Sequence, residues 1–287
     1  MYFDKEYGKR KNGFEEYLKG YLSNLNHIPE PLLSSMIYAL SGGGKRLRPV
    51  LFLSCSEAFG ASDKDSVNLL ALAIECIHTY SLIHDDLPCM DNADLRRGKP
   101  TCHKVYGESI AVLTGDALLN LTYELMFKAV SISSSDNARR FVRAAKLIAD
   151  NCGATGLIGG QVVDTVVDSS RHLSAKLNYI HQHKTADLIS AAMTAGAIVG
   201  GATNEDIETI AKIGDNIGFA FQIVDDILDS ESGEDEGKCS FVNVYGKKEA
   251  RNAVADKTAL ALDLLLKLKG DFSFIHSLIS HLSLRKE

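Results

Sequence analysis

Apolar residues fill several long segments of the chain, and the polar residues among them do not alternate with the period of two that predicts strands. The segments 67–84 and 110–130 are apolar nearly all round, which is typical of helices buried on all sides. The segment 187–202 is rich in Ala and Gly, and the segment 207–229 is rich in Ile and Asp, so both are also expected to form helices. The pattern predicts an all-α fold of long helices, some with polar faces directed inward.

Capping residues and chain breakers predict the ends of these helices. Ser62 and Asp65 fit a capping box before the first of them, and Thr203 and Asp206 fit another before the last. The glycine pair 200–201 predicts a C-terminal stop. The remaining predicted breaks are 41–44, 91–100, 131–137 and 230–238.

Composition bounds the class of protein. The chain has 287 residues, of which 45% are apolar and 24% charged, as in ordinary globular proteins. No break has the composition of a domain linker and no internal repeat occurs, so we expect a single domain over residues 1–287. The net charge of −6 argues against a nucleic-acid partner, and any basic site must be local.

The cysteines and the N-terminal sequence indicate the cellular compartment of the protein. The six cysteines are scattered without a CxxC pair, which is typical of reduced thiols in the cytosol. The first ten residues have neither the apolar run of a signal peptide nor the acid-poor pattern of a transit peptide. No uninterrupted apolar stretch has the length of a membrane span. We therefore expect a cytoplasmic protein without a membrane span.

The sequence "DDILD" places three acids near the end of the last apolar helix. Asp225 and Asp229 are four residues apart and lie on one helix face, with Asp226 beside them. Carboxylates in such an apolar setting are costly to bury unpaired, and a hard divalent cation would offset that cost. Ligands that are all oxygen favour magnesium over zinc. The alternative for this motif alone is a solvated acidic turn.

A second acidic cluster, "HDDLPCMDNADLRRGKP" (84–100), ends the helix 67–84. Asp91 is six residues after Asp85 and would point elsewhere in an ideal helix. Pro88 distorts the helix, however, and a widened turn could return Asp91 to the side of Asp85. With Asp86, these acids and the later motif predict facing walls of one metal-filled pocket.

The basic residues after these acids indicate the ligand. Arg96, Arg97 and Lys99 follow directly, and arginine binds phosphate with two parallel hydrogen bonds. Magnesium usually bridges protein carboxylates to phosphate oxygens. The segment therefore predicts a site for a magnesium diphosphate. A surface of intrahelical salt bridges fits poorly, because DLPCMDN is not a regular helix.

Basic residues also gather in "GGGKRLRP" (42–49). A Walker motif is excluded because Lys45 is followed by Arg46 instead of Ser or Thr. We expect a helix start at which Lys45 and Arg48 bind phosphate.

Two further groups of candidate site residues are weaker evidence when each is taken alone. His78 lies about two helical turns before Asp85 and so on roughly the same face, although a lone histidine is more often part of the core. Lys184 and Thr185 in "HQHKTADL" add a third basic point.

Taken together, the motifs resemble the short-chain trans-prenyltransferase family, the farnesyl and geranylgeranyl diphosphate synthases. The similarity runs from about residue 36 to 230, and the insertion of Pro88 and Cys89 is similar to bacterial farnesyl (geranyltranstransferase) and plant-type geranylgeranyl synthases. The motifs occur in the order "GGGKRLRP", "IHTYSLIHDDLPCMDNADLRRGKPT", "GDALL", "GGQVVD", "HKTADL" and "FQIVDDILD".

The resemblance implies the isoprenoid synthase fold, an all-α bundle of long helices around a deep central pocket, in a homodimer. It implies three Mg²⁺ ions bound by Asp85, Asp91 and Asp225, which are catalytic together with Lys184. Asp86, Asp226 and Asp229 would orient metal-bound water or hydrogen-bond partners. The allylic diphosphate would be held by Arg96, Lys184, Thr185 and Gln222, and isopentenyl diphosphate by Lys45, Arg48, His78 and Arg97.

Two departures from the family pattern are visible. Ala93 stands where an acid is common, and the segment after Asp229 is shorter than in many relatives. In it Lys238 alone takes the place of the loop lysines, and Ser240 and Phe241 replace a Thr-Tyr pair.

The chemistry that the resemblance implies is condensation of isopentenyl diphosphate with dimethylallyl or geranyl diphosphate. Metal ions and cations stabilise the leaving diphosphate, and apolar helices exclude the water that would quench the carbocation.

Tyr80 carries the prediction of product length. It lies five residues before Asp85, roughly 7–8 Å deeper along the helix. In the resembled family this position is aromatic in bacterial farnesyl synthases, so a bulky ring here predicts a fifteen-carbon product. The alternatives are plain core packing of Tyr80, a geranylgeranyl diphosphate synthase, or a non-catalytic regulatory subunit of a heteromeric synthase.

Overall fold

A computed structural model describes residues 2–166, 173–233 and 239–282 of the chain. The chain divides into two compact units, Met1–Leu53 with Asp63–Phe141, and Ser54–Ser62 with Val142–Glu287. Two helices, α3 (Leu47–Ala58) and α7 (Ala138–Cys152), run from one unit into the other.

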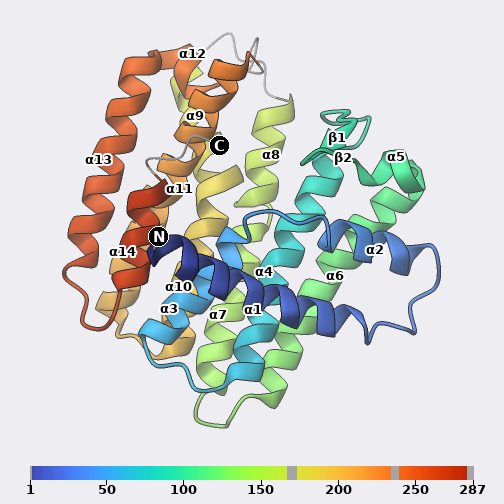
Figure 1. Cartoon of the computed structure of the whole chain (residues 1–287), viewed down its shortest axis with the longest axis horizontal. Coiled ribbons are helices and arrows are strands. Elements are labelled where there is room, and N and C mark those ends of the chain that lie inside the picture. Colours follow the sequence, from blue (N-terminus) through green and yellow to red (C-terminus); the bar gives the residue numbers. More distant parts are fainter. Residues whose placement is uncertain (1, 167–172, 234–238, 283–287) are drawn as a thin grey trace. The chain divides into compact units, whose positions relative to one another are not determined.

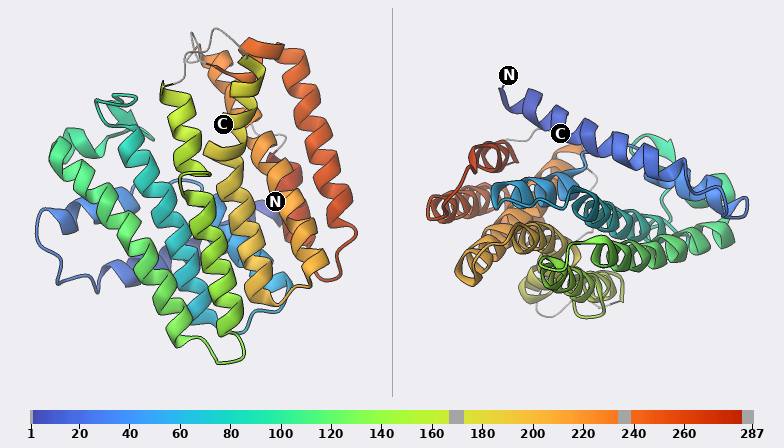
Figure 2. Two further views of the ribbon diagram at one scale, coloured as in Figure 1. Left: turned by 180° about the vertical axis from the view of Figure 1, so that it is seen from behind. Right: turned by 90° about the horizontal axis from the view of Figure 1, so that it is seen from below.

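The first unit is built on two long helices, α4 and α6, that pack side by side, with α1 crossing α4 (Figures 1 and 2). Leu72 and Ile74 of α4 and Leu118 and Leu125 of α6 are fully buried and belong to the core of this unit. Besides the start of α3, the elements are α1 (Tyr2–Leu22), α2 (Leu32–Leu40), α4 (Lys64–Asp85), β1 (Leu95–Arg96), β2 (Lys99–Pro100), α5 (Cys102–Tyr106) and α6 (Glu108–Ile132).

The second unit is centred on α11, which packs against α10 and α13 (Figure 1). Every residue of α10 is buried, in keeping with its apolar sequence. Besides the end of α7, the elements are α8 (Leu157–Val166), α9 (Leu173–Ile180), the π-helical turn η1 (His181–Ala186), α10 (Asp187–Gly200), α11 (Asn204–Ser232), α12 (Phe241–Tyr245), α13 (Lys247–Leu265) and α14 (Ser273–Leu282).

The prediction of an all-α fold is confirmed, with one small addition. The strands β1 and β2 form an antiparallel hairpin in which Leu95 pairs with Pro100, inside the predicted break 91–100. The single-domain prediction stays a prediction, because a division into compact units does not say whether they fold separately.

The predicted helix ends hold in the second unit. The Thr203 hydroxyl accepts a hydrogen bond from the Asp206 backbone N–H at 3.1 Å and so caps α11. Gly201 follows α10 in the left-handed conformation with φ of 91°, as a C-terminal glycine does.

The capping box predicted before α4 is wrong. The N-cap residue is Asp63, and its side chain does not cap its own helix. Its carboxylate accepts hydrogen bonds from the Ser134 backbone N–H at 3.2 Å and from Asn137 Nδ2 at 2.9 Å. A tertiary partner beyond the end of α6 therefore replaces the local one.

Two of the described helices, α4 and α6, have the length and apolar composition of a membrane span. The most apolar stretch of α4 is 78% buried within the protein, which accounts for its composition as that of a core helix.

Candidate active site

The first acidic motif folds into a wide turn at the end of α4. The Asp91 backbone N–H donates to the Asp85 carbonyl oxygen at 2.9 Å, and the Asn92 N–H donates to the Leu87 carbonyl oxygen at 3.0 Å. Pro88, which has no N–H to donate, lies inside this turn. The backbone thus returns Asp91 to Asp85 across six residues, by the kind of widened turn that the sequence suggested.

Asp86 points away from solvent and pairs with Arg96. Arg96 Nε donates to Asp86 Oδ1 at 3.0 Å and to Oδ2 at 3.3 Å, and Arg96 Nη2 donates to Oδ1. Burial raises the pKa of Asp86 although Arg96 opposes the shift. Burial works against the charge of Arg96, but the pairing with Asp86 outweighs it and raises the pKa of Arg96. The pair ties the hairpin to the end of α4.

Three residues predicted for the isopentenyl site lie together. Arg48 Nη1 and Arg97 Nη2 each lie 3.5 Å from His78 Nε2. Burial, Arg48 and Arg97 hold the pKa of His78 well below its usual value, so the ring is neutral at pH 7. Two guanidinium groups on a neutral imidazole make a basic cluster suited to phosphate oxygens.

The loop before α3 completes this basic cluster. Arg97 Nη1 donates to the Gly43 carbonyl oxygen at 2.5 Å. A Cβ on Gly44, whose φ is +115°, would lie 2.4 Å from Arg97 Nη1, so a side chain there would displace the guanidinium. Lys45 follows in the same loop and is exposed.

Sequence reasoning missed the role of Arg46, which lies between the two cations predicted to bind phosphate. Its side chain is buried and donates to Glu15 Oε1 at 2.7 Å, to Glu75 Oε1 at 2.5 Å and to the Leu40 carbonyl oxygen at 2.5 Å. Glu75 was the available signal, because an acid inside the apolar segment 67–84 requires a buried partner.

The second acidic motif lies on α11, whose helix is continuous through it. Asp225 and Asp229 are partly exposed, whereas Asp226 is buried. Asp226 accepts hydrogen bonds from Gln222 Nε2 at 3.1 Å and from the Phe241 backbone N–H at 2.6 Å. His181 Nε2 lies 3.1 Å from Asp226 Oδ2, the oxygen that also accepts the hydrogen bond from Phe241. These contacts fix Asp226 inside the unit, whereas Asp225 and Asp229 remain partly exposed on the same helix.

Three of the four residues predicted for the allylic site, Lys184, Thr185 and Gln222, lie in the second unit, whereas the fourth, Arg96, belongs to the first. Lys184 and Thr185 belong to η1, and π-helical turns are frequent at functional sites. The Thr185 hydroxyl donates to Gln222 Oε1 at 2.6 Å, and Lys184 Nζ lies 2.7 Å from Asp164 Oδ2. A chain of contacts therefore runs from Thr185 through Gln222 to Asp226.

Sequence reasoning did not single out Asp164 or His181. Asp164 was within reach, because it ends the quoted motif "GGQVVD". His181 gave no local signal, since its contact with Asp226 joins residues far apart in the chain.

Tyr80 lies on α4, five residues before Asp85, and its side chain is buried, with 4% of the residue exposed. Its ring packs edge-on against the ring of His84, with centroids 6.0 Å apart. Gly115 of α6 makes room for His84, because a Cβ there would lie 2.0 Å from His84 Nε2. The role of Tyr80 in product length stays a prediction.

Lys238, predicted to bind substrate, lies outside the described residues.

The donor set fits magnesium held jointly with a phosphate. Within the described residues no group of three or more His, Cys, Asp or Glu side chains is placed to hold a metal ion unaided. Magnesium commonly takes one or two carboxylates and completes its shell with water and substrate phosphate. The carboxylates of Asp85 and Asp91 in the first unit, and of Asp225 in the second, could serve as such oxygen ligands.

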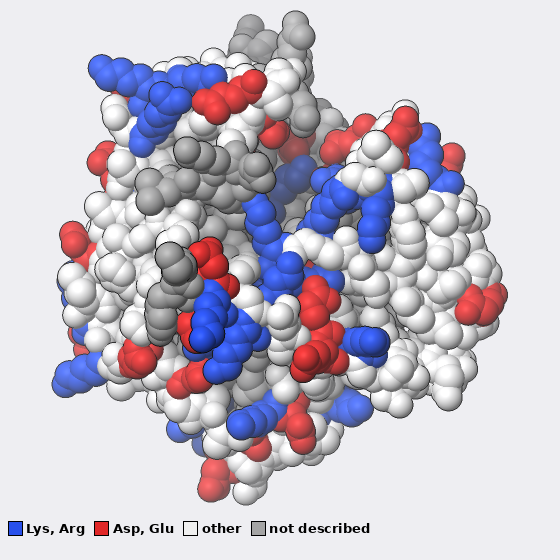
Figure 3. All heavy atoms as spheres, in the orientation of Figure 1, with Lys and Arg blue, Asp and Glu red and all other residues white. Residues whose placement is uncertain are grey.

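The surface charge is mixed. On the face drawn in Figure 3, Lys and Arg side chains are interspersed with Asp and Glu side chains. This mixture agrees with the net charge of −6 and with a local basic site.

Comparison with known proteins identifies the family. The family described as polyprenyl synthetase matches residues 29–260, which include all the acidic and basic motifs above. The chain belongs to the polyprenyl synthetase family.

Two curated relatives differ in their named products. The chain is 42% identical over 283 residues to farnesyl diphosphate synthase of Bacillus subtilis (strain 168), covering 97% of this chain and 92% of the relative. It is 43% identical over 254 residues to the chloroplastic geranylgeranyl pyrophosphate synthase of Catharanthus roseus, covering 85% and 68%. Both names describe a synthase of a prenyl diphosphate.

A solved structure shows the same fold. Geranyltransferase from Helicobacter pylori, complexed with magnesium and isoprenyl diphosphate, matches with a TM-score of 0.78 and 34% sequence identity. The match covers 97% of this chain and 95% of that one. The isoprenoid synthase fold expected from the sequence is therefore confirmed.

Proposed function

We propose that the protein is a magnesium-dependent prenyltransferase that condenses isopentenyl diphosphate with dimethylallyl and geranyl diphosphate to give farnesyl diphosphate. The observation that carries the proposal is the basic cluster of Arg48, His78 and Arg97 beside the acidic turn of the same unit. The farnesyl diphosphate synthase of Bacillus subtilis, similar over nearly the whole chain, supports the product.

The first step is assigned to the two acidic motifs and the allylic residues. Bound Mg²⁺ supplies positive charge that stabilises the departing diphosphate. Asp85, Asp91 and Asp225 would bind the ions, three in number. Arg96, Lys184, Thr185 and Gln222 would hold the allylic diphosphate, and Asp164 orients Lys184.

The second substrate is assigned to the basic cluster. Lys45, Arg48, Arg97 and the neutral ring of His78 would hold the diphosphate of isopentenyl diphosphate. Its double bond attacks the allylic carbon, and the released diphosphate takes the proton lost in forming the new double bond. Water is excluded by the apolar walls, to which buried Tyr80 belongs.

The second candidate is geranylgeranyl diphosphate synthesis, which the Catharanthus roseus relative supports. Buried Tyr80 favours the shorter product, because a large ring below the acidic turn limits the depth available to the tail. A non-catalytic regulatory subunit is disfavoured, because both acidic motifs are intact.

One assay tests the proposal. The protein is incubated with Mg²⁺, isopentenyl diphosphate and each allylic primer, and the dephosphorylated products are identified by mass. We expect farnesol from both dimethylallyl and geranyl diphosphate. Geranylgeraniol as the main product would contradict the farnesyl assignment, and no product from any primer would contradict the enzyme assignment.

We also propose a cytoplasmic homodimer. On α6, Leu113, Tyr123 and Phe127 follow helical spacing and are 52%, 37% and 73% exposed. An exposed apolar stripe of this kind fits a second copy of the same helix. The six cysteines are free thiols, which fits a reducing compartment.

A further inference from the structure

The N-terminal helix α1 contacts the loop of residues 43–46, here called the basic loop, at two points. The Tyr7 hydroxyl donates to the Lys45 carbonyl oxygen at 2.5 Å. Eight residues later, Glu15 accepts from Arg46 Nε at 2.7 Å. Two adjacent loop residues are therefore each held by a side chain of α1.

This loop has little local structure to hold it. Between the end of α2 and the start of α3, residues 43–46 belong to no helix or strand. Gly43, Gly44 and Arg46 have positive φ values of 81°, 115° and 52°. A non-glycine residue in the left-handed region persists only where its surroundings fix it. For Arg46 the surroundings are Glu15, Glu75 and the Leu40 carbonyl oxygen.

The loop in turn carries the phosphate-binding groups. Lys45 precedes Arg46, and Arg48 follows it in the first turn of α3. Arg97 donates a hydrogen bond to the Gly43 carbonyl oxygen. Because Arg46 is buried and donates its hydrogen bonds to Glu15, Glu75 and the Leu40 carbonyl oxygen, it fixes the backbone from which Lys45 and Arg48 project and does not itself face a substrate.

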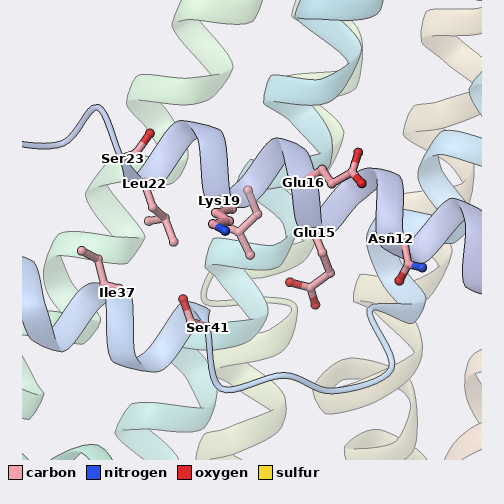
Figure 4. Close-up of a pocket in the computed structure, with 9 residues that line it drawn as sticks. Asn12, Glu15, Glu16, Lys19, Leu22, Ser23, Ile37 and Ser41 are labelled. Carbon is pink, nitrogen blue, oxygen red and sulfur yellow. The ribbon is translucent and has the colours of Figure 1, made fainter.

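Glu15 and its neighbour Glu16 differ in direction. Both line a pocket between α1 and α2 of about 660 Å³. In Figure 4 Glu15 points toward the chain that follows Ser41, whereas Glu16 points away from it. Glu16 is therefore a matched control on the same helix.

We infer that α1 positions the basic loop through Tyr7 and Glu15, and thereby sets the affinity of the chain for isopentenyl diphosphate. The inference rests on the proposed function of Lys45 and Arg48 in binding that diphosphate. It goes beyond the family, because α1 (Tyr2–Leu22) lies outside the residues 29–260 that the family matches. Tyr7 and Glu15 are positioning residues that act through the loop.

The test is calorimetric titration of full-length variants with isopentenyl diphosphate alone, which reports affinity whether or not product forms. We expect Tyr7→Phe, which deletes one hydroxyl, to raise the dissociation constant about fivefold. Glu15→Ala should raise it about tenfold, because a charged hydrogen bond to Arg46 is lost. Glu15→Gln should restore most of the affinity, since the amide oxygen still accepts from Arg46 Nε.

The controls separate positioning from general damage to α1. Glu16→Ala, and Tyr17→Phe on the same helix, should leave the dissociation constant unchanged. In steady-state assays Tyr7→Phe should raise KM for isopentenyl diphosphate and leave kcat and KM for geranyl diphosphate unchanged. Unchanged affinity in both Tyr7→Phe and Glu15→Ala, or equal losses in Glu16→Ala, would overturn the inference.

Two further variants distinguish failure of this inference from failure of the proposed function. Lys45→Ala should weaken isopentenyl diphosphate in the same titration, and Lys184→Ala should weaken geranyl diphosphate. If Lys45→Ala has its effect and the α1 variants have none, positioning by α1 is wrong and the loop assignment stands. If Lys45→Ala and Arg48→Ala both bind isopentenyl diphosphate normally, the loop assignment is wrong and the inference falls with it.

Discussion

At the scale of single residues, the carboxylates of the two acidic motifs have different surroundings. Asp86 is buried and accepts a hydrogen bond from Arg96. Asp226 is buried and accepts hydrogen bonds from Gln222 and from the Phe241 backbone N–H. Asp85 and Asp225, one residue earlier in each motif, are partly exposed. This difference supports the proposal that the first acid of each pair binds the metal ion, while the second holds neighbouring groups in place.

Replacing the first acids should therefore abolish turnover without unfolding the protein. We expect Asp85→Asn or Asp225→Asn to lower kcat by several orders of magnitude, because the carboxylate charge proposed to bind magnesium is removed. Steady-state kinetics and circular dichroism measure the two effects. Asp256→Asn, at an exposed acid of α13, is the control. Near-normal turnover in either variant, or full activity in excess chelator, would refute metal binding by these acids.

Product length should respond to Tyr80. We expect Tyr80→Ser to yield chains of twenty carbons or more, because the ring no longer limits the depth below Asp85. The cavity should cost about 3 kcal/mol of unfolding free energy. Tyr80→Phe keeps the ring and should keep the fifteen-carbon product. Chromatography of the dephosphorylated products decides the matter: a folded Tyr80→Ser protein that still makes farnesol means that Tyr80 is plain core packing.

At the scale of elements, η1 is held between α8 and α11. On the α8 side the contact is unusually close, because Gly160 faces the backbone of Lys184. On the α11 side Thr185 bonds Gln222. The position of Lys184 therefore depends on packing between helices as well as on its ion pair with Asp164.

Gly160→Ala should disturb that packing. The added Cβ would lie 2.3 Å from the Lys184 backbone nitrogen, so α8 or η1 must move. We expect a loss of about 2 kcal/mol of unfolding free energy and a higher KM for the allylic substrate. Gly13→Ala on α1, where a Cβ meets nothing within 4 Å, should instead add up to about 1 kcal/mol. Denaturant titration compares them, and equal stability of the two variants would contradict the close packing.

At the scale of the whole molecule, stability should fall at alkaline pH. Burial is the main cause that raises the pKa of both Tyr7 and Tyr21 from 10.0 to about 12. Between these values the unfolded chain releases protons that the folded protein keeps, so the unfolding free energy decreases as pH rises from 10 toward 12. Urea unfolding at several pH values measures the slope. The double variant with Tyr7→Phe and Tyr21→Phe should show a shallower decrease, and an unchanged slope would mean that these two groups do not contribute.

Assembly is the second property at this scale. We expect the protein to sediment as a dimer, and Phe127→Lys to shift it toward monomer because a charge would enter an apolar interface. Leu266→Lys places the same charge at a residue that is 77% exposed and lies outside α6, and should leave the dimer intact. Sedimentation velocity over a range of concentrations gives the result. A monomeric unmutated protein would contradict the homodimer.

The sequence by itself determined the long helices, several of their ends and the residue types of the site. Long apolar segments predicted α4, α6, α10 and α11, and Thr203 and Gly201 marked helix ends correctly. Pro88 already suggested the widened turn between Asp85 and Asp91. These features depend on residues within a turn or two of one another, so their physics can be read from neighbouring positions.

Only the tertiary structure decided which partner each buried polar group takes. Asp63 bonds the chain beyond α6 instead of capping its own helix, Arg46 pairs with Glu15 and Glu75, and His181 contacts Asp226. The members of each pair are tens of residues apart in the chain. A buried charge must be compensated by some partner, but the identity of that partner is fixed by which helices pack together, and local sequence does not encode it.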